Sequence, residues 1–442
     1  MTIRMDEGAA ELLDTLHRAG YAAYVVGGCV RDSLLGLTPH DWDLCTSALP
    51  QQGMELFGEE KCIPTGLQHG TVTVKQGGGL YEITTFRTEG AYTDGRHPDE
   101  VHFVPDVRED LARRDFTINA MAYNAKEGLV DPFGGQADLQ SGILRAVGVP
   151  HQRFTEDALR ILRLYRFAAR FGFSIDPPTA QAAQELCAHL DCVSVERIEE
   201  ELAKLLSAPA PAAYLDEKIL GVVLPELSPE ALAAAKPVVD ACPAGEQALP
   251  VRLAALLLSL GEDGTRRTLR RLRCSNACIE ETAVLVREVV SGVPGAFSSD
   301  TNRAIPSPAL LPAATGSHPS GRSSEKLPAR PPVSLNIYTR KLLGQYGLKT
   351  VQRLAALGTA LQPEHAADFA ALSELAERLD ADGVCCRVSQ LAVNGRDLMA
   401  AGVPAGPGIR KMLEALLDGV IREEYPNERQ ALLAAVQQLA AS

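Results

Sequence analysis

The sequence has no surplus of positive charge. Its 442 residues include 43 Lys and Arg against 56 Asp and Glu, a formal net charge of −13. A surface that is basic throughout is therefore excluded, and any contact with nucleic acid must come from local basic patches. Hydrophobic residues make up 46% of the chain, which excludes a wholly disordered protein.

Long apolar runs are also missing. No stretch approaches the roughly 18 uninterrupted apolar residues of a transmembrane helix. The charged, amphipathic segment 1–20 lacks the apolar centre of a secretory signal. We therefore expect a cytoplasmic protein that has no membrane as a partner, and nothing in the sequence indicates an obligate protein partner.

Cysteine is sparse, with ten residues in the chain. Cys274 and Cys278 are four positions apart and Cys385 and Cys386 are adjacent, but neither pair has companion ligands at the spacing of a zinc site. The cysteines are expected to be reduced, buried thiols.

The composition changes along the chain. Up to about residue 145 the pattern is that of a mixed α/β domain, and from about residue 151 apolar residues recur at helical spacing. The elements expected in the first part are helices near 6–19 and 30–35, and strands at 24–26, 41–46, 70–75 and 80–86. Segment 88–101 is polar and contains glycine, which predicts a mobile loop. Segment 292–333 is rich in Pro, Ser, Gly and Ala without periodicity, which predicts a disordered insertion.

A double glycine joins the strand expected at 24–26 to the next helix. Glycines let a phosphate approach backbone N–H groups at a helix N-terminus, so Gly28 is a candidate phosphate-binding residue. The guanidinium group of Arg31 can donate charge-assisted hydrogen bonds to a triphosphate oxygen. An ordinary strand-turn-helix corner explains the same residues, and the glycines alone favour that explanation.

Asp41 and Asp43 flank Trp42. In a strand both carboxylates would project from one face, with Trp42 directed into a core. A divalent cation would relieve their repulsion, and Mg²⁺ prefers oxygen ligands. Glu82, in another expected strand, would complete a two-metal site. Solvated acids in a turn and on a sheet face are the alternative.

Two arginine-containing segments are further candidates. Arg114, which follows Arg113 before an apolar run, either reaches phosphate or pairs with acids at a helix start.

Segment 155–166 predicts a helix with Thr155 as its N-cap. Asp157 and Arg160 would share one face of that helix, and Arg163 and Arg166 continue a basic spiral. Arginines on a largely apolar helix need partners, either acids elsewhere or phosphates.

Local basic clusters are compatible with RNA binding through shape and backbone. Their members are Arg266, Arg267, Arg270, Arg271 and Arg273 in one cluster, and Arg145, Arg153, Arg160, Arg163, Arg166 and Arg170 in the other. For the first cluster, a solvated helix face explains the pattern equally well.

Together these stretches resemble the bacterial class II tRNA nucleotidyltransferases, meaning the CCA-adding enzymes and the related bacterial poly(A) polymerases. The motifs are VVGGCVRDSLLG, the D-x-D of PHDWDLCTSALP, LQHGTVTV, YEITTFRTEG, RRDFTINAMAYN, DPFGGQADL and EDALRILRLYRFAARFGF. The resemblance covers residues 20 to about 205 and resumes in the C-terminal stretch LAVNGRDLMAAGVPAGPGIRKMLEALLDGVIREEYPNE. Segment 292–333 does not match.

The resemblance implies an α+β fold with a small mixed-sheet nucleotidyltransferase head followed by an all-helical neck, body and tail. The implied boundaries are 1–145 for the head, 146–210 for the neck, 211–335 for the body with its insertion, and 336–442 for the tail. The body and tail would bind tRNA.

It also implies residue roles and a reaction. The roles are triphosphate binding by Gly28 and Arg31, Mg²⁺ binding by Asp41 and Asp43 with Glu82 as the third catalytic carboxylate, nucleotide binding by Arg114, base reading by Asp157 and Arg160, and completion of the pocket by Arg163 and Arg166. The reaction would be template-independent addition of CCA to the 3′ end of tRNA from CTP and ATP, with release of pyrophosphate.

Other activities remain open. A poly(A) polymerase, or an enzyme that adds only the terminal A or only C residues, shares these motifs. Segment 88–101 favours a full CCA enzyme over one that adds only C, because such relatives tend to lack this loop. A phosphohydrolase of the HD type is disfavoured because the His40-Asp41 dipeptide has no matching distal His/Asp set. A non-catalytic RNA-binding module is disfavoured by the intact carboxylate set.

Overall fold

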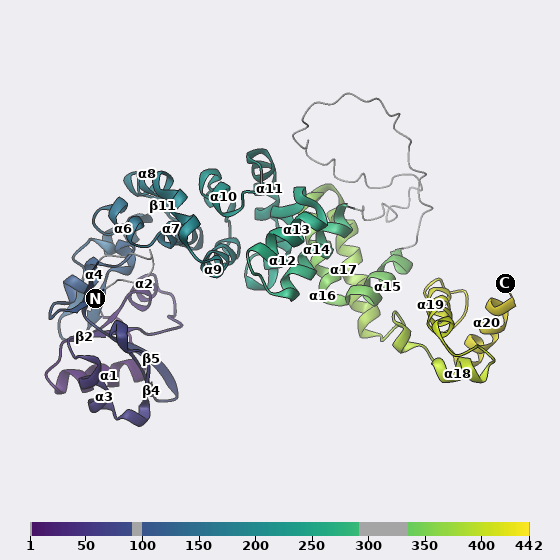
Figure 1. Cartoon of the computed structure of the whole chain (residues 1–442), viewed down its shortest axis with the longest axis horizontal. Helices are drawn as coiled ribbons and strands as arrows, with labels where there is room; N and C mark the ends of the chain where they lie inside the picture. The colour runs from purple at the N-terminus through teal and green to yellow at the C-terminus, as the bar shows by residue number, and fades with distance from the viewer. Residues whose placement is uncertain (1, 91–99, 291–334, 442) are drawn as a thin grey trace. The chain divides into compact units, whose positions relative to one another are not determined.

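The computed structural model describes residues 2–90, 100–290 and 335–441 (Figure 1). The chain forms two compact units, Met1–Pro225 and Glu226–Ser442, which are described separately. Most of the loop expected at 88–101, and the insertion expected at 292–333, lie outside the described residues. The boundaries of the four domains expected from the sequence stay a prediction.

The first unit contains a mixed sheet. Within the described residues it has seven strands in the order β3-β4-β5-β2-β1-β8-β9. Their bounds are β1 Ala23–Val26, β2 Leu44–Thr46, β3 Cys62–Gly66, β4 Thr71–Gln76, β5 Gly79–Thr85, β8 Ala122–Asn124 and β9 Gly128–Val130. Strand β1 is antiparallel to β2 and β8, whereas β2 is parallel to β5. The small mixed sheet confirms the fold predicted for the head.

Helices surround and follow this sheet. Their bounds are α1 Glu7–Arg18, α2 Gly28–Leu34, α3 Pro50–Phe57, α4 Val107–Ala112, α5 Gly135–Ser141, α6 Pro150–Glu156, α7 Leu159–Phe171, α8 Pro177–Leu186, α9 Val195–Leu206 and α10 Glu217–Val223. Short strands also pair, namely β6 Arg87–Glu89 with β7 Val101–Phe103 and β10 Ile143–Leu144 with β11 Ser174–Ile175. The described ends of the expected loop at 88–101 therefore form a two-stranded ladder.

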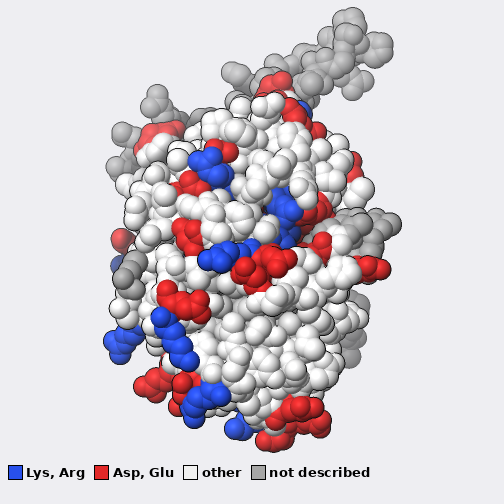
Figure 2. Space-filling view, turned by 90° about the vertical axis from the view of Figure 1, so that its left-hand side faces the viewer, with Lys and Arg blue, Asp and Glu red and all other residues white. Residues whose placement is uncertain are grey.

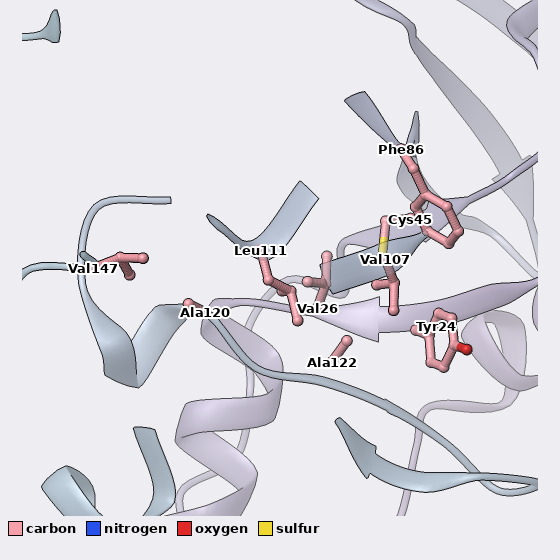
Figure 3. Close-up of a cluster of buried hydrophobic side chains, with 9 residues drawn as sticks. All are labelled: Tyr24, Val26, Cys45, Phe86, Val107, Leu111, Ala120, Ala122 and Val147. Carbon is pink, nitrogen blue, oxygen red and sulfur yellow. The ribbon is translucent and has the colours of Figure 1, made fainter. Parts of the chain in front are cut away.

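Apolar side chains from several elements form one core beside strands β1 and β2. Tyr24 and Val26 of β1 meet Phe86, and Leu111 of α4 packs into the same cluster (Figure 3). Phe86 and Leu111 are fully buried. This cluster holds α4 against the sheet, and α4 leads directly into the candidate nucleotide-binding arginine Arg114.

Two predicted elements differ in the structure. The strand expected at 41–46 begins only at Leu44, and Trp42 is half-buried rather than directed into a core. The N–H of Val26 still donates to the carbonyl of Asp43 at 2.9 Å. Pairing cannot continue further, because β1 ends at Val26 and Gly27 turns the chain with φ 77°.

The helix expected at 155–166 is divided into α6 and α7. Asp157, between them, has an extended backbone with φ −144° and ψ 103°. Its Oδ1 accepts the N–H of Leu159 at 3.1 Å, a local bond that competes with helix continuation. Thr155 is therefore not an N-cap, and its hydroxyl donates to the carbonyl of His151 inside α6.

The second unit is helical throughout its described part, as predicted. Its helices are α11 Pro229–Ala241, α12 Leu249–Leu257, α13 Gly261–Arg271, α14 Asn276–Val290, α15 Leu335–Tyr346, α16 Leu348–Leu361, α17 Ala366–Ala381, α18 Gly395–Ala400, α19 Pro407–Ile421 and α20 Arg429–Ala441. Among all described helices of the chain, none is long and apolar enough to cross a membrane.

The cysteines are free thiols, as expected. Burial raises the pKa of Cys29 to about 11 and that of Cys242 to about 12, so both thiols stay protonated and unreactive near neutral pH. The prediction of burial is wrong for Cys192, which is exposed, and for Cys278, which is half-buried.

Helix α5 packs closely on the 3-10 turn Thr117–Asn119. A Cβ added to Gly135, the first residue of α5, would lie 2.2 Å from the carbonyl oxygen of Thr117. A backbone oxygen cannot yield as a flexible side chain can. The small residue at position 135 thus sets how near α5 comes to the turn that precedes β8.

We predict that Gly135→Ala lowers the free energy of unfolding by about 1–3 kcal/mol, the usual cost of overpacking. Gly53→Ala is the matched control, because Gly53 lies in α3 with no atom within 4 Å of its added Cβ. That change should stabilise the protein by about 0.5–1 kcal/mol. Urea unfolding measures the free energy of unfolding of both variants. Equal changes for Gly135→Ala and Gly53→Ala would contradict the close approach of α5 to Thr117.

Candidate active site

The glycine corner and two arginines lie together. Gly27 has φ 77°, in the left-handed region that favours glycine, and α2 begins at Gly28. Arg114 Nη1 lies 3.1 Å from the position of a Cβ on Gly27, and Arg31 Nη2 lies 3.6 Å from that of a Cβ on Gly28. The corner thus combines the free N–H groups of a helix start with two guanidinium groups.

The candidate catalytic carboxylates also come together. Strands β2 and β5 are parallel with Leu44 opposite Ile83, which aligns the preceding residues Asp43 and Glu82. Crowding by protein atoms and the charges of Glu82 and Asp41 raise the pKa of Asp43, while Arg114 opposes this shift. The backbone places Asp43 beside the glycine corner, because its carbonyl accepts the N–H of Val26, the residue before Gly27, at 2.9 Å.

These acids fit a hydrated divalent cation. Asp41, Asp43 and Glu82 are exposed, and within the described chain none of their carboxylates forms an ion pair with Arg or Lys. Oxygen donors that are open to solvent suit Mg²⁺, which keeps waters and substrate phosphates in its shell. Among the described residues, no three His, Cys, Asp or Glu side chains form a preassembled metal cluster.

Arg114 is held by a buried acid. Its Nη2 lies 3.2 Å from Oδ2 of Asp110, a carboxylate with no exposed side-chain surface. Asp110 also accepts from Arg113 at 2.8 Å and from the backbone N–H of Arg87. Burial alone would raise the pKa of Asp110, but Arg113 and Arg114 lower it below its ordinary value. Asp110 therefore remains a charged anchor for Arg114.

Arg31 is buried in a polar network. Its Nε donates to Asp32 Oδ1 at 2.7 Å and its Nη1 donates to Asn119 Oδ1 at 2.6 Å. The rings of Phe167 and Phe171, both on α7, lie 5.2 and 4.9 Å from its guanidinium carbon. Arg31 therefore connects α2 both to the 3-10 turn and to α7.

Asp115 extends this network to α7. Its Oδ1 accepts from Asn119, and its Oδ2 accepts from Arg163 at 2.6 and 3.0 Å. Burial alone would raise the pKa of Asp115, but Arg163 and Asn119 outweigh it and hold the pKa well below its ordinary value.

The other arginines of α7 are paired with acids as well. Arg160 contacts Glu156 at 2.8 Å and donates to the carbonyls of Arg153 and Arg113. Arg166 pairs with Glu201 of α9, and its guanidinium carbon lies 3.8 Å from the ring centre of Phe167. Of the two kinds of partner expected for these arginines, the structure shows acids.

Asp157 and Arg160 do not form an ion pair with each other. Asp157 instead pairs with Arg197 of α9 at 2.8 Å. Asp157 and Arg160 therefore have separate partners; Asp157 lies in the break between α6 and α7, and Arg160 lies in the first turn of α7.

The basic cluster on α13 is partly neutralised. Arg266 pairs with Glu262 and Glu280, and Arg271 pairs with Glu226. On the face shown in Figure 2, acidic and basic side chains are likewise interspersed rather than separated. Among the described residues, neither these pairs on α13 nor the face in Figure 2 forms a continuous basic patch.

Besides Asp110, sequence reasoning missed further residues that contact the predicted site residues, among them four that form two pairs at i, i+4 spacing. These four are Asp115, Asn119, Arg197 and Glu201. The first two belong to RRDFTINAMAYN at i, i+4 spacing, and the last two have the same spacing in the amphipathic segment 195–206. The i, i+4 spacing indicates that the two residues of each pair share a face, but it does not reveal which residues elsewhere in the chain they contact.

Comparison with known protein families identifies the class. Residues 23–145 match the family described as the poly A polymerase head domain. Residues 172–230 match a probable RNA and SrmB-binding site of polymerase A, and 337–436 match tRNA nucleotidyltransferase domain 2. The head is thus that of a polymerase-type nucleotidyltransferase.

Whole-chain relatives narrow this class. The CCA-adding enzyme of Lactiplantibacillus plantarum is 35% identical over 97% of this chain and 95% of its own. That of Geobacillus thermodenitrificans is 35% identical, with 96% and 95% covered. The Bacillus stearothermophilus CCA-adding enzyme in complex with CTP has a TM-score of 0.77 at 30% identity, with 99% and 98% covered. The chain belongs to the CCA-adding enzyme family.

We predict that Asp115→Asn lowers the free energy of unfolding at pH 7 by about 2–4 kcal/mol, between the cost of a lost charged hydrogen bond and that of a broken buried ion pair. Because the folded-state pKa of Asp115 is depressed, its contribution is present above the unfolded pKa of about 4 and is lost as the pH falls below it. The difference in free energy of unfolding between the wild type and Asp115→Asn should therefore become smaller from pH 7 to pH 3.

Urea unfolding at several pH values measures this gap. Asp14→Asn is the control, because Asp14 forms an exposed i,i+4 pair with Arg18 and should change stability by less than about 1 kcal/mol. A constant gap for Asp115→Asn across the pH range would contradict the assigned charge.

Proposed function

We propose that this protein adds CCA to the 3′ end of tRNA without a nucleic-acid template, transferring nucleotides from CTP and ATP and releasing pyrophosphate. One observation carries the proposal. Asp43 and Glu82 are aligned across β2 and β5, and Arg114 lies at the adjoining glycine corner, in a chain that is similar over nearly its whole length to CCA-adding enzymes. The Bacillus stearothermophilus relative, described with CTP, supports the nucleotide class.

Nucleotide binding would use both guanidinium groups at the corner. Gly28, Arg31 and Arg114 would bind the triphosphate, because backbone N–H groups and arginine forks stabilise phosphate oxygens. Arg163 and Arg166 would complete the pocket from α7. Phosphoryl transfer needs mainly positioning and charge stabilisation, so no covalent intermediate with the protein is required.

The exposed acids would hold the metal ions. Asp41 and Asp43 would bind Mg²⁺, with Glu82 as the third carboxylate. Bound Mg²⁺ supplies activation of the tRNA 3′-hydroxyl and neutralisation of charge on the phosphates. The parallel register of β2 and β5, which aligns Asp43 with Glu82, supports this proposal.

Base selection would use Asp157 and Arg160. Cytosine and adenine each present an exocyclic amine beside a ring-nitrogen acceptor, which an acidic acceptor and a basic donor can match. Uracil and guanine reverse this order and would leave polar groups unpaired. Each mismatch costs on the order of 1–3 kcal/mol, which gives discrimination by factors of tens or more.

A poly(A) polymerase or a partial enzyme that adds only A or only C is the alternative. Purified protein should be given tRNA that lacks its 3′ end, together with each nucleoside triphosphate separately. Incorporation of two C residues followed by one A supports full CCA addition, whereas repeated A or a single nucleotide type supports an alternative. A cytoplasmic location and the absence of an obligate protein partner stay predictions.

We predict that Asp41→Ala or Asp43→Ala lowers nucleotide transfer by at least about 10³-fold while tRNA affinity changes little, because these acids serve the metal and not the RNA. Single-turnover incorporation and a tRNA-binding titration measure the two properties. Asp14→Ala is the control, since Asp14 is an exposed acid on α1. Wild-type turnover by either variant would remove the metal assignment.

We predict that Asp157→Ala or Arg160→Ala strongly lowers CTP and ATP incorporation and relaxes discrimination against UTP and GTP. The reason is the loss of one of the two groups that match the base edge. Incorporation of all four nucleotides is measured at matched folded fraction. Unchanged selectivity in both variants would leave Asp157 as only a cap for α7.

A further inference from the structure

Helix α9 presents two charged residues to the candidate base-reading segment. Arg197 and Glu201 are four positions apart and therefore share one helix face, and α9 packs against α7. Arg197 Nη2 lies 2.8 Å from Asp157 Oδ2. Glu201 pairs with Arg166 and lies 3.7 Å from Arg163. Each charge on this face thus meets the opposite charge.

These pairs are shielded from solvent. The side chains of Arg197 and Asp157 are 22% and 15% exposed, and Glu201 is 5% exposed. Another pair on the same helix, Lys204 with Glu200, is about half exposed at 47% and 63%. Helix α9 therefore carries two shielded ion pairs toward α7 and the break before it, and one solvent-facing pair, Lys204 with Glu200, that serves as a control.

Asp157 is held from two sides. Its Oδ1 accepts the backbone N–H of Leu159, and its Oδ2 accepts from Arg197. Asp157 lies at the break between α6 and α7, where no continuous helix restrains its side chain. An ionised carboxylate has about four acceptor positions, so two bound donors fix its orientation and leave others for a ligand.

We infer that Arg197 is a positioning residue for nucleobase selection: it orients the Asp157 carboxylate so that this acidic group favours the amine-bearing edges of cytosine and adenine over the carbonyl-bearing edges of uracil and guanine. Arg197 does so through Asp157 and without contacting the nucleotide. The inference rests on the proposed function and adds a residue of α9 to it. Loss of Arg197 frees the carboxylate to rotate, and a rotated acceptor no longer discriminates between the two kinds of edge.

A purely structural role makes a different prediction. If the Arg197–Asp157 pair only stabilises the packing of α9 against the break before α7, its loss lowers the stability and the total activity. The incorporation of all four nucleotides then falls by the same factor. Selectivity therefore separates the two roles, whereas stability does not.

The test compares Arg197→Gln, Arg197→Lys and the control Lys204→Gln in the full-length protein. For each variant, kcat/KM is measured for CTP against UTP and for ATP against GTP on tRNA ending at the matching position, together with the thermal midpoint. Arg197→Gln should lower both discrimination ratios by about tenfold or more. Arg197→Lys should restore part of the loss, and Lys204→Gln should match wild type.

Unchanged discrimination ratios in a folded Arg197→Gln variant would overturn the inference. If that variant does not fold, Arg197→Lys decides, since full wild-type selectivity despite a changed donor geometry would count against the inference and a partial loss would support it. The wild-type assay reports separately on the proposed function: failure of wild type to add C and A refutes that function, whereas the variant-to-wild-type ratio reports on Arg197 alone.

Discussion

The candidate site depends on a buried ionic connection centred on Asp115. This carboxylate accepts from Arg163 on α7 and from Asn119, and Asn119 in turn accepts from Arg31 on α2. Arg31 pairs with Asp32. The glycine corner and α7 are therefore joined through Asn119 by hydrogen bonds that each have at least one charged partner, and such bonds are stronger than those between neutral groups. Movement of α7 away from the corner would leave buried charges unpaired, at a cost of several kcal/mol.

The site separates its charges into two kinds. The arginines of α7 and the two arginines at the glycine corner all have acidic partners within the protein, so their geometry is set before any ligand arrives. By contrast, Asp41, Asp43 and Glu82 are exposed, and the described chain gives them no ion-pairing arginine or lysine. Arginines that are already held in place suit the binding of a triphosphate by the protein. Acids that are open to solvent suit the binding of metal cations, which neutralise the negative charge that develops during phosphoryl transfer. The two sets also meet, since Arg114 acts on the pKa of Asp43.

Much of this arrangement could be predicted from the sequence, but two local predictions were wrong for identifiable reasons. The strand expected to carry Asp41 and Asp43 begins after them, because the neighbouring strand ends at the Gly27 turn and offers no further partner. The helix expected to begin at Thr155 breaks at Asp157, whose side chain bonds to the N–H of Leu159. In both cases periodicity indicated the right type of element, and a specific turn or side-chain bond decided its boundary.

The sequence by itself determined the mixed α/β start, the helical remainder and the family, because helix and strand periods and ordered motifs are local properties of the chain. It also indicated that the arginines of α7 needed partners. Only the tertiary structure decided which partners they have. Asp115 is 48 positions from Arg163, Glu201 is 35 from Arg166, and Arg197 is 40 from Asp157. No residue spacing encodes such pairs, since they form only when packing of α7 against α9 and the head removes water and leaves each charge one nearby neighbour of opposite sign.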